Sequence, residues 1–188
     1  MINNNENSSE KDIISFRERL DVKVLEYIKE NFQNPILDKL MVLFTVMGEL
    51  GMLWIGIGLM LIMQEKYRNK GIVIFVTLSI TTIIGEGVIK NIFQRKRPCH
   101  GISCKDLLIK KPKSYSFPSG HTASSIAAAT VLSTFFTPYA IIFFGIAVLI
   151  AFSRMYLYVH YPTDILAGIA LGVLCSQTTL YMLRGMII

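Results

Sequence analysis

Three short polar segments decide how this chain is organised: Lys90–Pro98 (KNIFQRKRP), Pro118–His121 (PSGH) and Ser153–Asp164 (SRMYLYVHYPTD). Each contains side chains that bind phosphate or transfer protons, among them lysine, arginine, serine, histidine and aspartate. Long apolar runs lie before, between and after them. Basic residues such as Lys90 and Arg97 flank membrane helices routinely and, taken alone, would be interfacial anchors. The combination of all three segments indicates a functional site.

The apolar runs read as membrane helices, and their order brings the three segments together. We expect helices over residues 71–92, 119–136, 139–152 and 162–183, since about 20 residues cross the ~30 Å hydrocarbon core and shorter runs can be extended. If the first helix ends at one face of the membrane, the second leaves from that face, the third returns to it and the fourth starts there. All three polar segments therefore converge on one side of the membrane.

The composition is that of a membrane protein. Of the 188 residues, 52% are hydrophobic and 17% are charged, and the mean hydropathy is +0.49, which is unusual for a soluble domain. The net charge of +6 does not indicate nucleic-acid binding, because the basic residues lie at the ends of apolar runs, where they suit lipid head groups and phosphates. We expect a multi-pass protein of the plasma membrane whose partners are the bilayer and a lipid.

Residues 1–33 are expected to form a disordered start followed by an amphipathic helix. Over residues 12–32 the apolar positions, Leu20, Val24 and Ile28 among them, recur every three or four residues between mixed charges, which is typical of such a helix. The same apolar stripe suits a helix packed on the protein's own surface and a helix lying in the membrane interface.

Residues 34–188 are expected to form the membrane-embedded domain. Asn34 is a suitable N-cap for a helix over residues 35–47, which is too short to cross and breaks at Gly48. A span from about Glu49 to residue 64 then follows. The fold class predicted from all segments is an all-α integral membrane protein, a bundle of five to six transmembrane helices with an N-terminal amphipathic helix.

Five residues of the polar segments form a suitable anion site. Lys90, Arg97 and Arg154 supply three cations, two of them guanidiniums that can bind phosphate through two hydrogen bonds. Ser119 and Gly120 stand at a helix start, where unpaired N–H groups and the positive end of the helix dipole attract anions. Such a set neutralises the charge that develops on phosphate oxygens during phosphoryl transfer.

The two motif histidines and the aspartate supply nucleophile and acid. A carboxylate such as Asp164, bonded to one nitrogen of His160, would fix the tautomer that leaves the other nitrogen free to attack phosphorus. His121 is then the natural general acid.

The spacings K-x6-R-P, P-S-G-H and S-R-x5-H-x3-D resemble those of the type-2 phosphatidic acid phosphatase family, the lipid-phosphatase branch of the vanadium haloperoxidase superfamily. The resemblance runs from about Glu49 onward. It implies that His160 forms a phosphohistidine, that Asp164 orients it and that His121 protonates the leaving oxygen. The phosphate-binding residues that it implies are Lys90, Arg97, Ser119, Gly120 and Arg154. The family uses no metal, and three nearby cations would repel a divalent ion, so we expect neither a metal nor a cofactor.

Glu86 is an acid inside an apolar helix, four residues before Lys90 and so on the same helix face. We expect it to pair with Lys90 and hold the ammonium toward the site, because an unpaired carboxylate is expensive in a membrane. The alternative is a carboxylate that bonds a neighbouring helix.

Hydrolysis of a lipid phosphate or diphosphate is the function that these residues predict, most specifically conversion of undecaprenyl diphosphate to undecaprenyl phosphate. Phosphatidylglycerophosphate or phosphatidate is the alternative substrate. A non-catalytic lipid-phosphate binder or translocator is the alternative from another class, but binding alone requires no acid and no oriented imidazole.

The sequence also bears on sidedness. Lys66, Arg68 and Lys70 in a short loop favour the cytoplasm for that end. The loop over residues 93–117 is basic too, but several of its charges have a phosphate to bind, and bacterial members of the resembled family commonly act on the outer face, so we expect the site on the extracytoplasmic side. There Cys99 and Cys104 would be able to form a disulfide.

Overall fold

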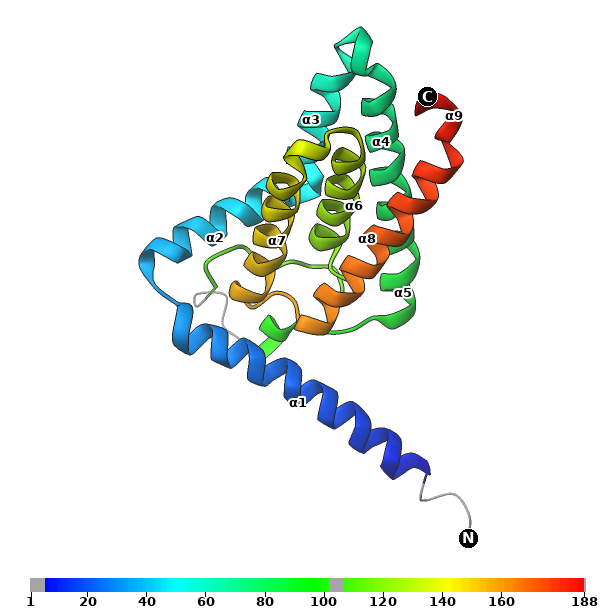
Figure 1. The fold of residues 1–188 in the computed structure, drawn as a ribbon. Coiled ribbons are helices and arrows are strands. Elements are labelled where there is room, and N and C mark those ends of the chain that lie inside the picture. Colours follow the sequence, from blue (N-terminus) through cyan, green and yellow to red (C-terminus); the bar gives the residue numbers. More distant parts are fainter. Residues whose placement is uncertain (1–5, 102–106, 188) are drawn as a thin grey trace.

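The computed structural model describes residues 6–101 and 107–187, and its regular elements are helical in both ranges. The helices are α1 Glu6–Phe32, α2 Pro35–Met47, α3 Met52–Ile62, α4 Arg68–Thr82, α5 Lys90–Phe93, α6 Gly120–Phe135, α7 Ala140–Tyr156, α8 Pro162–Met182 and α9 Arg184–Ile187. A π-helical segment, Ile83–Ile89, joins α4 to α5 without a break. Helices α3 to α8 stand side by side as a bundle, and α1 lies across one end of it (Figure 1).

Three helical stretches are long and apolar enough to cross a membrane: Glu65–Phe93, Thr137–Tyr156 and Pro162–Met182. The pair Pro35–Met47 and Glu49–Ile62 passes the same test together, with a bend of 50° between its halves. The chain is thus an all-helical, multi-pass membrane protein, as predicted. These stretches amount to three or four spans, fewer than the five to six expected from the sequence.

The bend between α2 and α3 lies where the sequence places it. Asn34 caps α2, its Oδ1 accepting hydrogen bonds from the backbone N–H groups of Ile36 and Leu37 at 3.1 and 3.0 Å. At the other end Gly48 closes the helix, and Gly51 has a φ of 70°, in the left-handed region that glycine adopts without strain. The chain turns there and enters α3.

The bundle core is formed by apolar side chains of α3, α4, α6 and α7. Trp54 is fully buried in it, and its Nε1 donates to Ser125 Oγ at 3.0 Å. Two glycines let α8 approach α6 closely: a Cβ on Gly168 would lie 2.7 Å from the backbone oxygen of Ser119, and one on Gly172 would collide with the backbone oxygen of Ala123 at 2.6 Å. Gly168-x3-Gly172 is therefore a helix-packing face, as its small-residue spacing suggests.

The outer faces of the bundle are apolar. Large apolar side chains are exposed there, and those of Ile36, Met63, Ile141 and Tyr181 are each at least 80% exposed. Many other apolar side chains are exposed to a smaller extent. Apolar surface of this extent suits contact with lipid tails.

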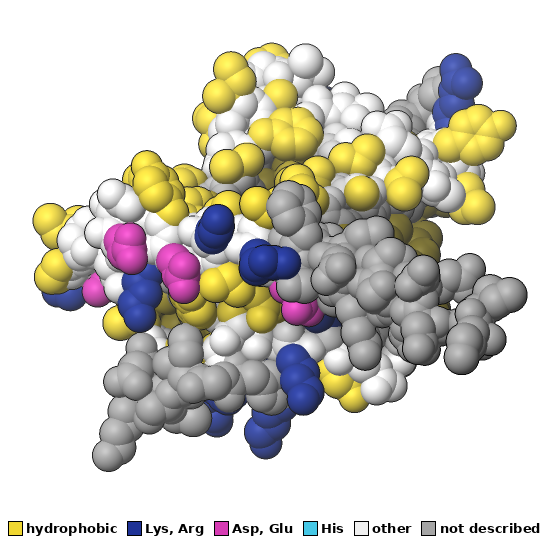
Figure 2. Space-filling model, turned by 90° about the horizontal axis from the view of Figure 1, so that it is seen from below, with side chains coloured by type: hydrophobic (Ala, Val, Ile, Leu, Met, Phe, Trp, Pro, Cys, Tyr) yellow, Lys and Arg dark blue, Asp and Glu magenta, His cyan; other side chains and the backbone are white. Residues whose placement is uncertain are grey.

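Helix α1 begins at Glu6, earlier than residue 12, and its buried face shares Ile28 with the expected apolar stripe but not Leu20 or Val24. Leu25, Ile28 and Asp21 are buried against the bundle, whereas Leu20 and Val24 remain 49% and 43% exposed. One stripe of α1 thus packs on the protein, and the adjacent apolar stripe is free to meet the membrane interface. Figure 2, seen from the α1 side, shows basic side chains distributed over this end of the molecule among apolar ones.

Candidate active site

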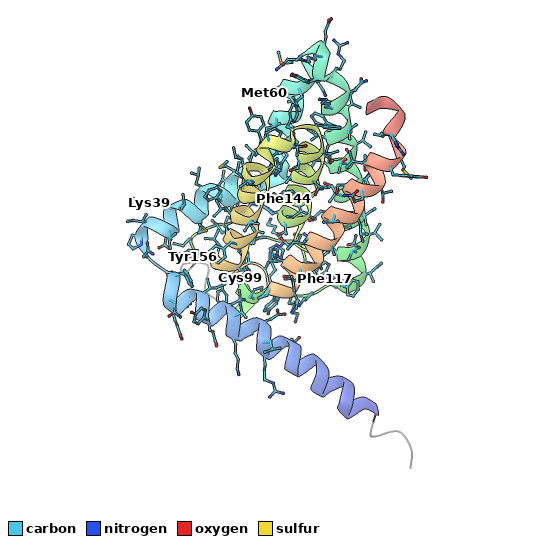
Figure 3. All side chains as sticks on the ribbon, viewed as in Figure 1. Lys39, Met60, Cys99, Phe117, Phe144 and Tyr156 are labelled. Atoms are coloured by element: carbon cyan, nitrogen blue, oxygen red, sulfur yellow. The ribbon has the colours of Figure 1, made fainter. Side chains whose placement is uncertain are left out.

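The structure brings the three polar segments to the end of the bundle that α1 covers. Helix α5 ends there, α6 and α8 begin there, and α7 ends there (Figure 1). Figure 3 shows Cys99 and Phe117, near the two ends of the long loop, at this end together with Tyr156, and Met60 at the opposite end. The predicted convergence on one face is present.

His160 and Arg97 are in direct contact. His160 is 1% exposed and lies in the turn between α7 and α8. Arg97 Nη1 lies 2.9 Å from His160 Nε2 and donates to the backbone oxygen of Val159 at 2.9 Å. Because a guanidinium only donates, the Nε2 atom accepts, which puts the imidazole proton on Nδ1. That tautomer leaves the lone pair on Nε2.

The surroundings of His160 keep its imidazole neutral. Burial lowers its pKa from the ordinary 6.5 to about 3, and the charges of Arg97 and Arg154 lower it too, while nearby Asp164 opposes them. The imidazole lone pair therefore stays available through the neutral range.

Asp164 lies in the first turn of α8 and is completely buried. Its Oδ2 accepts hydrogen bonds from Ser116 Oγ and, at 2.8 Å, from the backbone N–H of Tyr161. Its Oδ1 accepts from Arg95 Nη1 at 2.7 Å. The distance from Oδ2 to His160 Nδ1 is 3.5 Å, and Nδ1 makes no hydrogen bond among the described residues. Asp164 and His160 thus lie side by side, but no hydrogen bond joins them.

The start of α6 carries Ser119, Gly120 and His121. The backbone N–H of Ser119 donates to the backbone oxygen of Asp164 at 3.1 Å, which ties the starts of α6 and α8 together. A Cβ at Gly120 would collide with Glu86 Oε1, so the carboxylate of Glu86 lies directly against the start of α6.

Lys90 is buried at the C-terminal side of the π-helical segment. Its Nζ lies 2.6 Å from Glu86 Oε1 and donates to Ser114 Oγ at 3.3 Å. The predicted pairing of Glu86 with Lys90 is therefore present. The carboxylate also lies next to Gly120, between the ammonium and the N-terminus of α6.

Arg154 projects from the last turn of α7 and is 4% exposed. Its Nη1 donates to Thr45 Oγ1 of α2. Its Nε is buried and has no hydrogen-bond partner within the described part of the chain. A buried donor without a partner is costly, and an anion bound in the site would remove that cost.

Six of the predicted site residues line one cavity of about 910 Å³ together with Glu86. Its polar end is formed by Lys90, Arg97, Gly120, His121, Arg154 and His160. Its other end runs along α3, α4 and the π-helical segment, where Ile55, Phe75, Leu78 and Ile83 line it. A cavity with a cationic end and an apolar end fits an amphiphile with an anionic head group.

The sequence did not single out several residues that hold the site. They are Asp21, Thr45, Arg95, Ser114, Ser116 and Thr163. Arg95 was one of many basic loop residues, and nothing in its spacing distinguished it. Asp21 offered a faint signal, because it shares a helical face with Leu25 and Ile28, where a charge is unexpected.

The comparisons with known proteins agree with this geometry. The sequence model of the PAP2 superfamily matches residues 71–186. The chain belongs to the PAP2 superfamily. It is thereby a membrane lipid phosphatase, of a family whose hydrolases act without a metal, and the resemblance drawn from the three segments is confirmed. Helices α1 to α3 precede the matched region.

Individual relatives cover most of this PAP2 chain. It is 35% identical over 155 residues to the undecaprenyl-diphosphatase of Sulfolobus acidocaldarius, covering 81% of this chain and 73% of that protein. The crystal structure of Aquifex aeolicus LpxE is similar with a TM-score of 0.73 and 30% identity, covering 86% of this chain and 95% of that one. The transmembrane PAP2-type phosphatidylglycerolphosphate phosphatase from Bacillus subtilis is similar with a TM-score of 0.71 and 25% identity, covering 98% and 89%.

Cys99 is buried beside Tyr156 and Leu157 in an apolar cluster. Cys104 falls outside the described residues, so the disulfide between them stays a prediction.

Proposed function

We propose that this PAP2 enzyme hydrolyses undecaprenyl diphosphate to undecaprenyl phosphate and inorganic phosphate. The observation that carries the proposal is the cavity, which joins a cation-lined end holding His160 to an apolar end between helices. The similarity to an undecaprenyl-diphosphatase over most of the chain supports this substrate. A polyprenyl tail would stay in the bilayer and the apolar channel while the diphosphate enters the polar end.

In the proposed mechanism, His160 Nε2 attacks the terminal phosphorus and forms a P–N bond as the bridging P–O bond breaks. Arg97 must first give up its contact with Nε2, and a phosphate oxygen becomes the new partner of its guanidinium. His121 donates a proton to the leaving lipid phosphate. Water then attacks phosphorus, His121 takes up its proton, and inorganic phosphate leaves His160.

The remaining residues neutralise and orient. Lys90, Arg97 and Arg154, with the N-terminus of α6 at Ser119 and Gly120, are the proposed phosphate-binding set. Asp164 stabilises the positive charge that the imidazole of His160 acquires when Nε2 bonds to phosphorus.

Glu86 is proposed as the support that orients Lys90. When the site is empty, its carboxylate compensates the ammonium charge. A substrate phosphate would take over that role, so the two anions compete for one cation.

A second candidate is phosphatidylglycerophosphate or phosphatidate phosphatase. It is favoured by the fold similarity to the Bacillus subtilis enzyme, which extends over nearly the whole chain. Undecaprenyl diphosphate and the two glycerolipid phosphates would bind at the same polar end of the cavity. They differ in their tails and in the number of phosphates at the scissile group.

A substrate panel separates these candidates. The detergent-purified protein is given undecaprenyl diphosphate, phosphatidylglycerophosphate or phosphatidate in mixed micelles with excess chelator, and phosphate release is measured beside the His160→Ala variant. We expect the highest kcat/KM with undecaprenyl diphosphate. A higher value with either glycerolipid would replace the first candidate by the second. Binding without turnover of any of the three would instead point to a non-catalytic lipid-phosphate binder.

The bundle is proposed to cross the membrane five times. The three long stretches and the bent pair are joined by α6, whose 16 residues span about 24 Å at ~1.5 Å per residue. Helix α6 packs against α4, α7 and α8 and leaves from the end to which α7 returns, so it must traverse most of the bilayer with them.

The site is proposed to face the extracytoplasmic side. Lys66, Arg68 and Lys70 lie around the α3–α4 connection, at the end of the bundle opposite α1 (Figure 1), and basic residues favour the cytoplasm. A Lys66→Cys substitution in a cysteine-free background tests this in intact cells. Labelling by a membrane-impermeant thiol reagent would put the α3–α4 connection outside and the active site inside.

A further inference from the structure

Asp21 is a buried charge on α1, whose residues are mostly exposed from Glu18 to Phe32. It is 2% exposed and reaches from α1 to the start of α8. Its Oδ1 accepts from the backbone N–H of Thr163 at 3.1 Å, and its Oδ2 accepts from Thr163 Oγ1 at 2.6 Å. Oδ2 also accepts from Arg95 Nη2 at 2.7 Å. The residue after Thr163 is Asp164, so Asp21 bonds the immediate neighbour of the candidate catalytic carboxylate.

Arg95 connects the two carboxylates. Its Nη2 bonds Asp21, and its Nη1 donates to Asp164 Oδ1 and to Thr163 Oγ1, each at 2.7 Å. The guanidinium also lies 4.1 Å from the centre of the Tyr161 ring. A planar fork held on both arms has one orientation, which fixes where Asp164 Oδ1 lies.

The carboxylate of Asp21 changes the net charge beside His160. Asp21, Arg95 and Asp164 together carry one net negative charge. With Asp21 neutral, Arg95 would cancel the charge of Asp164. His160 becomes positive when it bonds phosphorus, and a net negative neighbour stabilises that state.

The geometry points in the same direction. The gap between Asp164 Oδ2 and His160 Nδ1 is 3.5 Å, so a small movement of the carboxylate toward the imidazole would complete a hydrogen bond. A guanidinium bound to Asp164 alone would pull that carboxylate away from His160. A guanidinium shared with Asp21 pulls less strongly.

We propose that Asp21 is a positioning residue for catalysis, which acts through Arg95 and Thr163 to keep these three charged groups net negative and Asp164 directed at His160. The inference rests on the proposed phosphohistidine mechanism. Helix α1 lies outside the region that matches the PAP2 family. The inference gives this helix a role in the chemistry as well as in packing. Asp21 itself touches no substrate.

The test compares Asp21→Asn with Glu18→Gln. Both remove one negative charge from α1, but Glu18 is exposed. We expect Asp21→Asn to lower kcat by roughly 10- to 100-fold, the usual effect of losing a residue that orients a catalytic group. The KM should stay within about twofold, because the cations that bind phosphate are unchanged. Glu18→Gln should behave as wild type.

A double variant separates positioning from simple anchoring of α1. If Asp21 acts by sharing Arg95, Asp21→Asn adds little to the kcat loss of Arg95→Gln, and the effects are non-additive. Multiplication of the two losses in the double variant would overturn the inference. So would a wild-type kcat in Asp21→Asn.

If Asp21→Asn fails to fold, Thr163→Val gives the answer, because it removes only the hydroxyl that donates to Asp21 and accepts from Arg95, and Thr163→Ser restores it. The expected result is a lowered kcat in the valine variant and a near-normal kcat in the serine variant, and a normal kcat in both would overturn the inference. Wild-type turnover is measured first, since an inactive wild type contradicts the proposed function and not the role of Asp21.

Discussion

Replacement of Arg97 by lysine keeps the charge of the site and removes its geometry. The guanidinium of Arg97 contacts both the long loop and the turn that holds His160. Toward the long loop it donates to the Ser114 backbone oxygen at 2.8 Å, to Ser114 Oγ at 3.1 Å and to the Tyr115 backbone oxygen at 3.1 Å. Toward the turn after α7 it contacts the Val159 oxygen and His160 Nε2. An ammonium is a single point with three donors and cannot reach both sides.

The size of the effect follows from these contacts. If lysine keeps the His160 side, the loop loses its connection to the nucleophile, and the phosphate loses the second arm of a bidentate contact. One hydrogen bond to a charged group contributes about 1.5–3 kcal/mol. At ~1.4 kcal/mol for each factor of ten, kcat/KM should fall roughly 10- to 100-fold.

The assay is phosphate release from undecaprenyl diphosphate by Arg97→Lys and by Lys96→Gln, with the thermal midpoint of each variant as a check on folding. Lys96 is exposed beside Arg97, so it controls for loop charge and should retain full activity. An Arg97→Lys enzyme within about threefold of wild type would refute the reasoning, because a point charge would then suffice.

Three further predictions concern the nucleophile. His160→Ala should abolish turnover while the cation cluster still binds substrate, and an acid-labile phosphoenzyme should be trapped in wild type only; residual turnover above a few per cent of wild type would exclude His160 as nucleophile. Excess chelator should leave the rate unchanged and vanadate should inhibit, whereas activity restored by a divalent ion would contradict the histidine mechanism. Because burial lowers the pKa of His160 to about 3, its imidazole should stay neutral as the pH falls from about 8 to about 4, the range in which an ordinary histidine becomes charged; ¹⁵N NMR of labelled histidines, assigned with His160→Ala, would detect a midpoint near 6.5 if burial had no such effect.

The sequence was sufficient for the parts of the fold that local chemistry determines. The cap at Asn34 and the break at Gly48 follow from residues that act on their own backbone. The Glu86–Lys90 pair follows from a spacing of four on one helix. The convergence of the polar segments follows from the alternation of helix directions alone.

Long-range pairing was out of reach of such reasoning. Asp21 and Arg95 are 74 residues apart in sequence, and no periodicity connects a helix to a loop. The face of α1 that packs on the bundle was undetermined for a related reason: Leu20 and Leu25 are equally apolar, and the bundle, not the helix, decides which of them is buried. Length and composition mark three or four spans, because α6 has only 16 residues, whereas the sequence-based count included apolar runs of any length.

The segment Arg95-Lys96-Arg97 of the long loop contributes two arginines to the site, which the basic composition of the loop does not reveal. Lys96 is exposed while the arginines on either side of it are turned inward, which is the alternation of an extended chain. The two inward guanidinium groups then contact different members of the His160–Asp164 pair. Arg97 contacts His160 at Nε2, and Arg95 contacts Asp164 at Oδ1. A shift by one residue would place lysine at the site and both arginines in solvent. His160 and Asp164 are therefore held between two guanidinium groups, and this arrangement depends on which residues of the short segment face inward.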